Sequence, residues 1–172
     1  MSVNGIKANP ASRKEIQAYA RYIKKVVGLE NVLYFPILQF VENVIPKIFP
    51  EFQFEIVPVY EMNEHGLTYP SSKIMKIRED VYEGAAIGEG RDRYTVAHET
   101  GHLFMHDNDS IALCRLEFPN SMRLYENPEW QADVFGGELL ASTYLIRGMT
   151  EVDVHNKCGV SWAAARTQLK YC

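Results

Sequence analysis

Residues 98–102 read His-Glu-Thr-Gly-His, which places two histidines four positions apart and a glutamate directly after the first. On an α-helix, residues i and i+4 lie on one face about 6 Å apart, so both imidazoles can bind one metal ion. Zinc binds imidazole nitrogens at about 2.0–2.1 Å, and Glu99, one step around the helix, can hold a water molecule beside the metal. The pattern therefore predicts a zinc-binding helix and indicates hydrolytic chemistry.

The residues around this pentapeptide favour a helix. One side of the segment is apolar and comprises Tyr94, Val96, Ala97, Leu103 and Phe104. Gly88 and Gly90 precede the segment and residues 107–109 (Asp-Asn-Asp) follow it, so helix breakers flank about three turns. The alternative interpretation is a helix on which two histidines only pack and bind no metal.

His106 is a third histidine on the same side, but the geometry excludes it as the third ligand. It lies eight residues after His98, which is about 12 Å along a helix axis at about 1.5 Å per residue. A single zinc ion cannot span that distance on a straight helix. We expect His106 to be structural and to close the helix near its C-terminus, where a cation is favoured.

A second segment can supply the third ligand. Asn127-Pro128-Glu129 is typical of a helix start, with Asn as N-cap and Pro at the first helical position. Glu129 and Asp133 then share a face, and two imidazoles with one carboxylate leave zinc an open position. Asp133 is suited to accept the second N–H of a ligand imidazole. The alternative is an ordinary solvated, acidic helix start.

Two adjacent glycines, Gly136 and Gly137, continue this second helix. Each glycine inside a helix costs about 1 kcal/mol relative to alanine. We therefore predict that another helix packs very close to this point.

Two segments resemble the ImmA/IrrE metallopeptidases. Residues 93–106 (RYTVAHETGHLFMH) are similar to that family's R-x-[FY]-T-[IVL]-A-H-E-x-G-H-x-x-x-H segment, and residues 129–140 to its E-x-x-A-[DN]-x-F-[AG]-x-x-L-L block. The resemblance covers about 74–140 well and implies that Glu129 is the third ligand. It also implies a gluzincin-like arrangement in which Asp133 supports His98. One difference is Ala141-Ser142, where the family usually has Met-Pro, and it concerns the wall of the substrate site.

The expected fold class is α+β, a small zincin-like domain over residues 1–172. N-terminal helices come first, then a short mixed or antiparallel sheet, the helix with the two histidines, the helix with Glu129, and short C-terminal helices. Periodicity and turn residues predict helices at 12–27, 36–45, 150–156 and 161–170 and strands at 52–56 and 73–78. Pro46 should stop or bend the second helix, and Pro58 places the first strand near a sheet edge. Because zincins often bind an extended substrate along a strand, we expect residues 74–78 to pair with it.

Composition indicates which class of protein this is and in which compartment it is expected. A chain of 172 residues that is 47% hydrophobic can form one compact domain, and it contains neither a membrane-spanning run nor an apparent secretory signal. Cys114, Cys158 and Cys172 are odd in number and widely spaced, which indicates reduced thiols and a cytoplasmic location. Residues 148–172 superficially resemble a helix-turn-helix, but with three Lys/Arg against two acids and a net charge of −4 for the chain, we expect no direct nucleic-acid binding. Recognition of a substrate or partner is the other role considered for this segment.

The expected function is that of a zinc-dependent endopeptidase in which Glu99 transfers the proton. By resemblance, its substrate would be a helix-turn-helix repressor of a phage, mobile element or stress regulon. One alternative is a catalytically idle zinc module that sequesters a repressor or antitoxin, and another is a small-molecule hydrolase such as an amidase. Tyr144, Arg147 and His155 are candidates for stabilising the oxyanion, and the oligomeric state stays open.

Overall fold

The computed structural model describes residues 7–107 and 123–172. Its first helix, α1 (Arg13–Val26), begins with the predicted capping box, in which Ser12 N donates to Glu15 Oε2 at 2.7 Å and Glu15 N donates to Ser12 Oγ at 3.3 Å. Gly28, with φ of 76°, follows its end. The helix buries one apolar stripe against the core, which confirms its prediction.

The second predicted helix is longer than expected. It begins as α2 (Ile37–Gln39), widens into a π-helical turn, η1 (Phe40–Val44), and continues as α3 (Ile45–Ile48). The helix does not stop at Pro46 but runs to Ile48, and the π-helical turn lies immediately before this proline.

A three-stranded mixed sheet contains β1 (Gln53–Val57), β2 (Gly66–Tyr69) and β3 (Ile74–Arg78) in the order β1-β3-β2. A short 3-10 turn, η2 (Val59–Glu61), follows β1. β1 is parallel to β3 and β2 is antiparallel to it, so β1 lies at an edge as Pro58 predicted. The expectation that 74–78 pairs with substrate is wrong, because β3 is the central strand and both of its edges are already paired.

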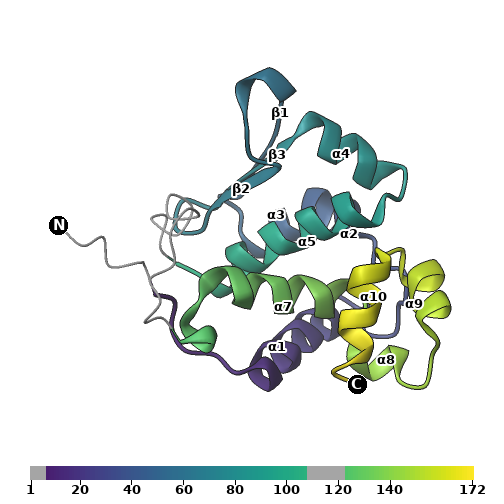
Figure 1. Ribbon diagram of the computed structural model, residues 1–172. Coiled ribbons are helices and arrows are strands. Elements are labelled where there is room, and N and C mark those ends of the chain that lie inside the picture. The colour runs from purple at the N-terminus through teal and green to yellow at the C-terminus, as the bar shows by residue number, and fades with distance from the viewer. Residues whose placement is uncertain (1–6, 108–122) are drawn as a thin grey trace.

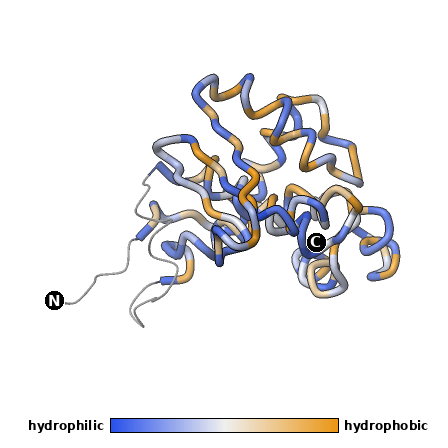
Figure 2. The backbone as a smooth tube through the Cα atoms, turned by 90° about the horizontal axis from the view of Figure 1, so that it is seen from above, coloured by the Kyte–Doolittle hydropathy of each residue, from blue (hydrophilic) through white to orange (hydrophobic). Residues whose placement is uncertain are grey.

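The sheet lies on one side of α5 (Gly90–Met105), and α7 (Pro128–Leu140) lies on the other (Figure 1). α4 (Glu79–Ala86) connects the sheet to α5, and the 3-10 turn η3 (Leu124–Glu126) precedes α7. α1 packs against the far side of α7. The hydrophobic residues spread along all of these segments, interleaved with hydrophilic ones (Figure 2), as expected for amphipathic elements around a shared core.

Glycines allow α5 and α7 to pack at very short range. A Cβ on Gly101 would lie 2.9 Å from the Ala132 backbone, and a Cβ on Gly136 would lie 3.0 Å from the backbone of Ala97 and His98. Gly137 instead faces the Gln168 side chain. The close approach predicted from Gly136 and Gly137 is therefore confirmed, and its partner on one side is the helix that carries the two histidines.

The C-terminal segment forms α8 (Thr143–Ile146), α9 (Glu151–Cys158) and α10 (Trp162–Leu169). Gly159, with φ of 63°, closes α9, and the buried Arg93 guanidinium donates to the carbonyls of Cys158 and Gly159 at 3.2 and 2.9 Å. These contacts attach the end of α9 directly to α5. Cys158 and Cys172 are free thiols, whereas Cys114 lies outside the described residues. No helix in the described ranges is both long and apolar enough to cross a bilayer.

Candidate metal centre

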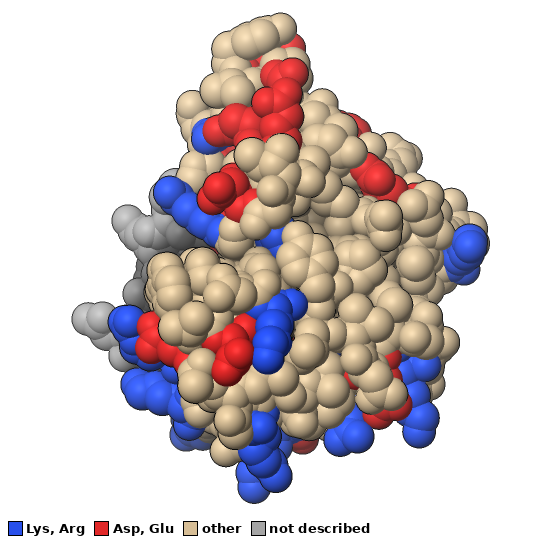
Figure 3. Space-filling view, turned by 90° about the vertical axis from the view of Figure 1, so that its right-hand side faces the viewer, with Lys and Arg blue, Asp and Glu red and all other residues tan. Residues whose placement is uncertain are grey.

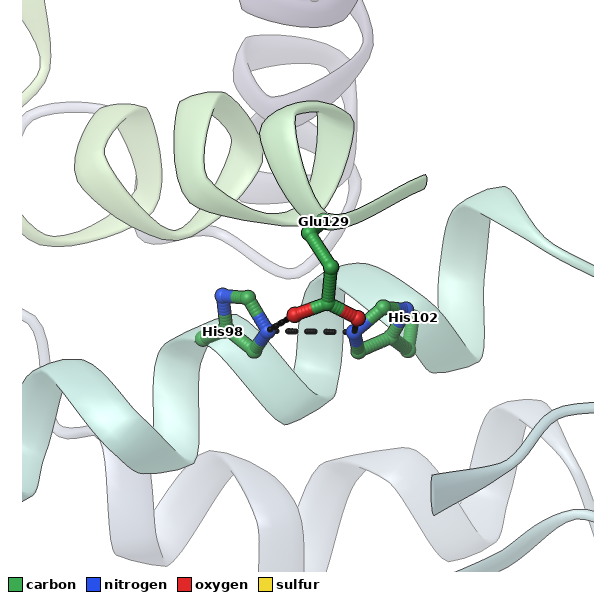
Figure 4. Close-up of side chains that lie close together, drawn as sticks. All are labelled: His98, His102 and Glu129. Atoms are coloured by element: carbon green, nitrogen blue, oxygen red, sulfur yellow. Dashed lines mark hydrogen bonds and ion pairs between the residues drawn. The ribbon is translucent and has the colours of Figure 1, made fainter. Parts of the chain in front are cut away.

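α5 and α7 bring two imidazoles and one carboxylate to a common point (Figure 4). His98 Nε2 lies 3.0 Å from His102 Nε2 and 3.2 Å from Glu129 Oε2. His102 Nε2 lies 3.1 Å from Glu129 Oε1. His102 is buried, while His98 and Glu129 are partly exposed. The three side chains therefore lie where the contact between α5 and α7 reaches the protein surface.

These separations fit a zinc ion. Ligand atoms placed tetrahedrally around zinc at about 2.0–2.1 Å are about 3.3 Å apart. The two imidazole nitrogens, 3.0 Å apart, are close to that separation, and each lies 3.1 or 3.2 Å from one of the two carboxylate oxygens of Glu129. Two neutral imidazoles and one carboxylate are also a ligand set that zinc accepts in hydrolases.

Asp133 lies one helical turn after Glu129 and contacts the first histidine. Its Oδ1 is 2.8 Å from His98 Nδ1, on the ring edge opposite the metal-facing nitrogen, and the carboxylate is about half exposed. Burial lowers the pKa of His98, but hydrogen bonds with Asp133 and Glu129 outweigh burial and raise that pKa to about 10 when no metal is bound. Metal binding must therefore release a proton from this imidazole.

Glu99 is buried beside the histidines and is held by the sheet. The Thr68 hydroxyl, on β2, donates to Glu99 Oε2 at 2.7 Å, and Gly66 lies so close that a Cβ there would be 2.7 Å from Glu99 Cγ. A hollow of about 300 Å³ opens next to them and is lined by Glu64, His65, Gly66, Tyr94, Thr95, His98 and Glu99. Glu99 and His98 therefore face the same accessible space.

The model of the IrrE N-terminal-like domain, peptidase family M78, matches residues 53–165, from β1 into α10. This chain belongs to that metallopeptidase family. None of the curated proteins matches the sequence. As an M78 metallopeptidase, the protein acts on a protein or peptide substrate, and α1 to α3 lie outside the matched range.

His106 lies where it was expected, at the C-terminal end of α5, but in a different environment. It does close α5, as its C-cap, but its ring is buried and its Nδ1 lies 3.0 Å from Nδ1 of His102. Burial, and to a smaller extent the neighbouring His102, lower the pKa of His106 to about 4. The ring is therefore neutral near pH 7, and the expected favourable cation at the helix end is wrong.

The structure separates the three oxyanion candidates from the metal-binding group. The Tyr144 hydroxyl donates to the carbonyl of Glu30, and His155 stacks on Trp162 with ring centroids 4.0 Å apart. Neither these two residues nor Arg147 lines the hollow beside His98. The hollow contains His65 and Tyr94 instead. Sequence reasoning missed His65 because β2 was not predicted, and it assigned Tyr94 only to the apolar side of the helix.

Proposed function

We propose that this M78 family member is a zinc-dependent endopeptidase and that residues 1–172 form one metallopeptidase domain. The observation that carries the proposal is the convergence of His98, His102 and Glu129 with a buried glutamate, Glu99, next to them. A site that only binds metal has no use for a base beside it. The zinc ligands would be the two histidines and Glu129, with Asp133 orienting His98.

The residues of the chain account for the proton transfers of peptide hydrolysis. Zinc, when bound, supplies a Lewis acid that polarises the scissile carbonyl and lowers the pKa of water. Glu99 takes a proton from the attacking water and donates it to the leaving amine. The Thr68 hydroxyl donates to Glu99 Oε2 and thereby orients the carboxylate for both transfers.

The substrate would extend along β2 rather than β3. β2 is an outer strand of the sheet, contacts α5, and carries Thr68 beside Glu99. Within the described residues no strand pairs with its other edge. An extended peptide added there by backbone hydrogen bonds would cross the hollow that contains His98 and Glu99.

As the substrate we propose a helix-turn-helix repressor in the cytoplasm, with residues 148–172 taking part in recognition. Two free thiols are consistent with a reducing compartment. On the side of α9 and α10, acidic and basic side chains are scattered around a broad uncharged area (Figure 3). Such a mixed surface is suited to a protein partner more than to nucleic acid.

The test is cleavage of a proteome-derived peptide library and of a panel of purified repressors by the zinc-loaded chain, read by mass spectrometry. Wild type should create new termini, and Glu99→Gln should create none while retaining one zinc per chain. Repressor capture without cleavage by wild type would instead favour the sequestering module. Cleavage that persists in Glu99→Gln would contradict the assigned base.

A further inference from the structure

We propose that His106 and Gln131 are positioning residues that fix the tautomer of His102 and thereby set the affinity of the site for zinc. The proposal rests on the zinc site proposed above and not on any particular substrate. It assigns a role in the metal centre to two residues that touch neither the metal position nor the hollow.

The chain of hydrogen bonds is anchored at Gln131, on α7. Gln131 Nε2 donates to the carbonyl oxygens of Asn9 and Tyr125 at 2.7 and 2.8 Å. A backbone carbonyl can only accept, so the opposite amide orientation would place an oxygen against two oxygens. The orientation of the amide is therefore determined, and Oε1 must face the other way, toward His106.

The next two links follow from this orientation. His106 Nε2 lies 2.9 Å from Gln131 Oε1, which can only accept, so the proton of the neutral ring is on Nε2. His106 Nδ1 then carries a lone pair and accepts from His102 Nδ1 at 3.0 Å. With its proton on Nδ1, His102 presents a bare Nε2 to the point shared with His98 and Glu129.

Burial makes this arrangement costly to disturb. His102, His106 and Gln131 are 2%, 6% and 1% exposed, so water cannot replace a missing partner. An unsatisfied buried polar group costs about 1–3 kcal/mol. If His102 held its proton on Nε2, two lone pairs would face each other at the Nδ1 contact and the metal-binding nitrogen would be blocked.

A purely structural role is the competing explanation, because the same hydrogen bonds connect α5, α7 and the segment before α1. Such a role would alter the free energy of unfolding but not the tautomer of His102 in the folded chain. Zinc affinity and the tautomer of the folded protein therefore distinguish the two explanations.

The experiment measures both quantities on the full chain. Zinc affinity is determined by competition with a fluorescent chelator for wild type, His106→Phe, Gln131→Met and His155→Phe. We expect a loss of about 10- to 100-fold for the first two variants, the usual effect of removing a partner of a ligand imidazole. His155→Phe is the matched control, since its ring bonds Val160 O away from the metal-binding group, and its affinity should be unchanged.

Imidazole ¹⁵N NMR of the zinc-loaded wild type at pH 8 tests the tautomers without any variant, because zinc then takes the place of a proton between His102 Nε2 and Glu129. Protons on His102 Nδ1 and on His106 Nε2 are expected, and a proton on His106 Nδ1 would overturn the proposal. Unchanged zinc affinity in both His106→Phe and Gln131→Met would overturn it as well. Failure of the wild type to cleave any peptide would contradict only the endopeptidase, because neither readout depends on cleavage.

Discussion

Gly101→Ala tests whether the distance between α5 and α7 determines the metal site. Gly101 precedes His102 and faces the first turns of α7, close to the turn that carries Glu129. Its substitution adds one methyl group at the place where the two helices approach most closely near the ligands. No ligand and no hydrogen bond is removed.

The magnitude follows from the contact distances. The new Cβ would lie 2.9 Å from Cα and O of Ala132, whereas ordinary contacts begin at 3.4 Å, so the helices must separate locally by 0.5 Å. Zinc sites tolerate deviations of about 0.2 Å in ligand distance. Overpacking costs about 1–3 kcal/mol, and the higher helix propensity of alanine offsets about 1 kcal/mol of it. We expect a net loss of stability of up to about 2 kcal/mol and a loss of zinc affinity of about tenfold or more.

Gly137→Ala is the matched control. It gives the same gain in helix propensity on α7, but its Cβ would meet the end of the Gln168 side chain, 2.7 Å away, and not the backbone of α5. Urea unfolding of the metal-free proteins and chelator competition should separate the two variants. Gly137→Ala should keep the zinc affinity of wild type even if it loses stability. Equal zinc affinity in Gly101→Ala and wild type would refute the reasoning that helix spacing controls the site.

Three further predictions concern charge and metal. Glu129→Gln keeps the shape of the side chain but removes the anionic ligand, so zinc content by elemental analysis should fall steeply, and unchanged content would contradict the ligand assignment. Zinc at 100 times its Kd should stabilise the fold by about 2.7 kcal/mol and raise the Tm by several degrees, reversed by a chelator. Burial lowers the pKa of Lys24 from 10.5 to about 8, so the folded state binds fewer protons than the unfolded state between those values. Wild type should therefore gain on the order of 2–3 kcal/mol relative to Lys24→Met as the pH rises from 8 to 10.5, measured by urea unfolding, and a constant difference would refute the burial argument.

Local patterns in the sequence predicted the elements that local chemistry determines. The capping box at Ser12 and the left-handed Gly28 bound α1, and the Asn127 side chain caps α7, accepting from Glu129 N at 2.9 Å. The two histidines four residues apart on α5 converge because helical geometry leaves them no other placement. Gly136 predicted the close approach of a second helix, because a glycine inside a helix lowers its stability and is expected where a side chain would not fit.

Other parts depend on contacts that no local pattern contains. β2 has only four residues, and its pairing depends on β3, so neither its existence nor the strand order could be predicted. Thr68 and Glu99 are 31 positions apart, and Gln131 and His106 are 25 apart. The oxyanion candidates were chosen because they follow α7 in the chain, but α8 and α9 turn away from the hollow beside His98.

The two ligand imidazoles receive opposite kinds of support, and burial explains the difference. His98 bonds a carboxylate, Asp133, that is 53% exposed, so water offsets much of the cost of that charge. His102 points into the core, where an ionised partner would lack water and would add a third carboxylate to Glu129 and Asp133 around one ion. A neutral histidine backed by a neutral amide fixes the ring equally well without that charge. The metal position thus keeps a higher positive potential than two carboxylate partners would leave it, which favours polarisation of a carbonyl by the bound metal.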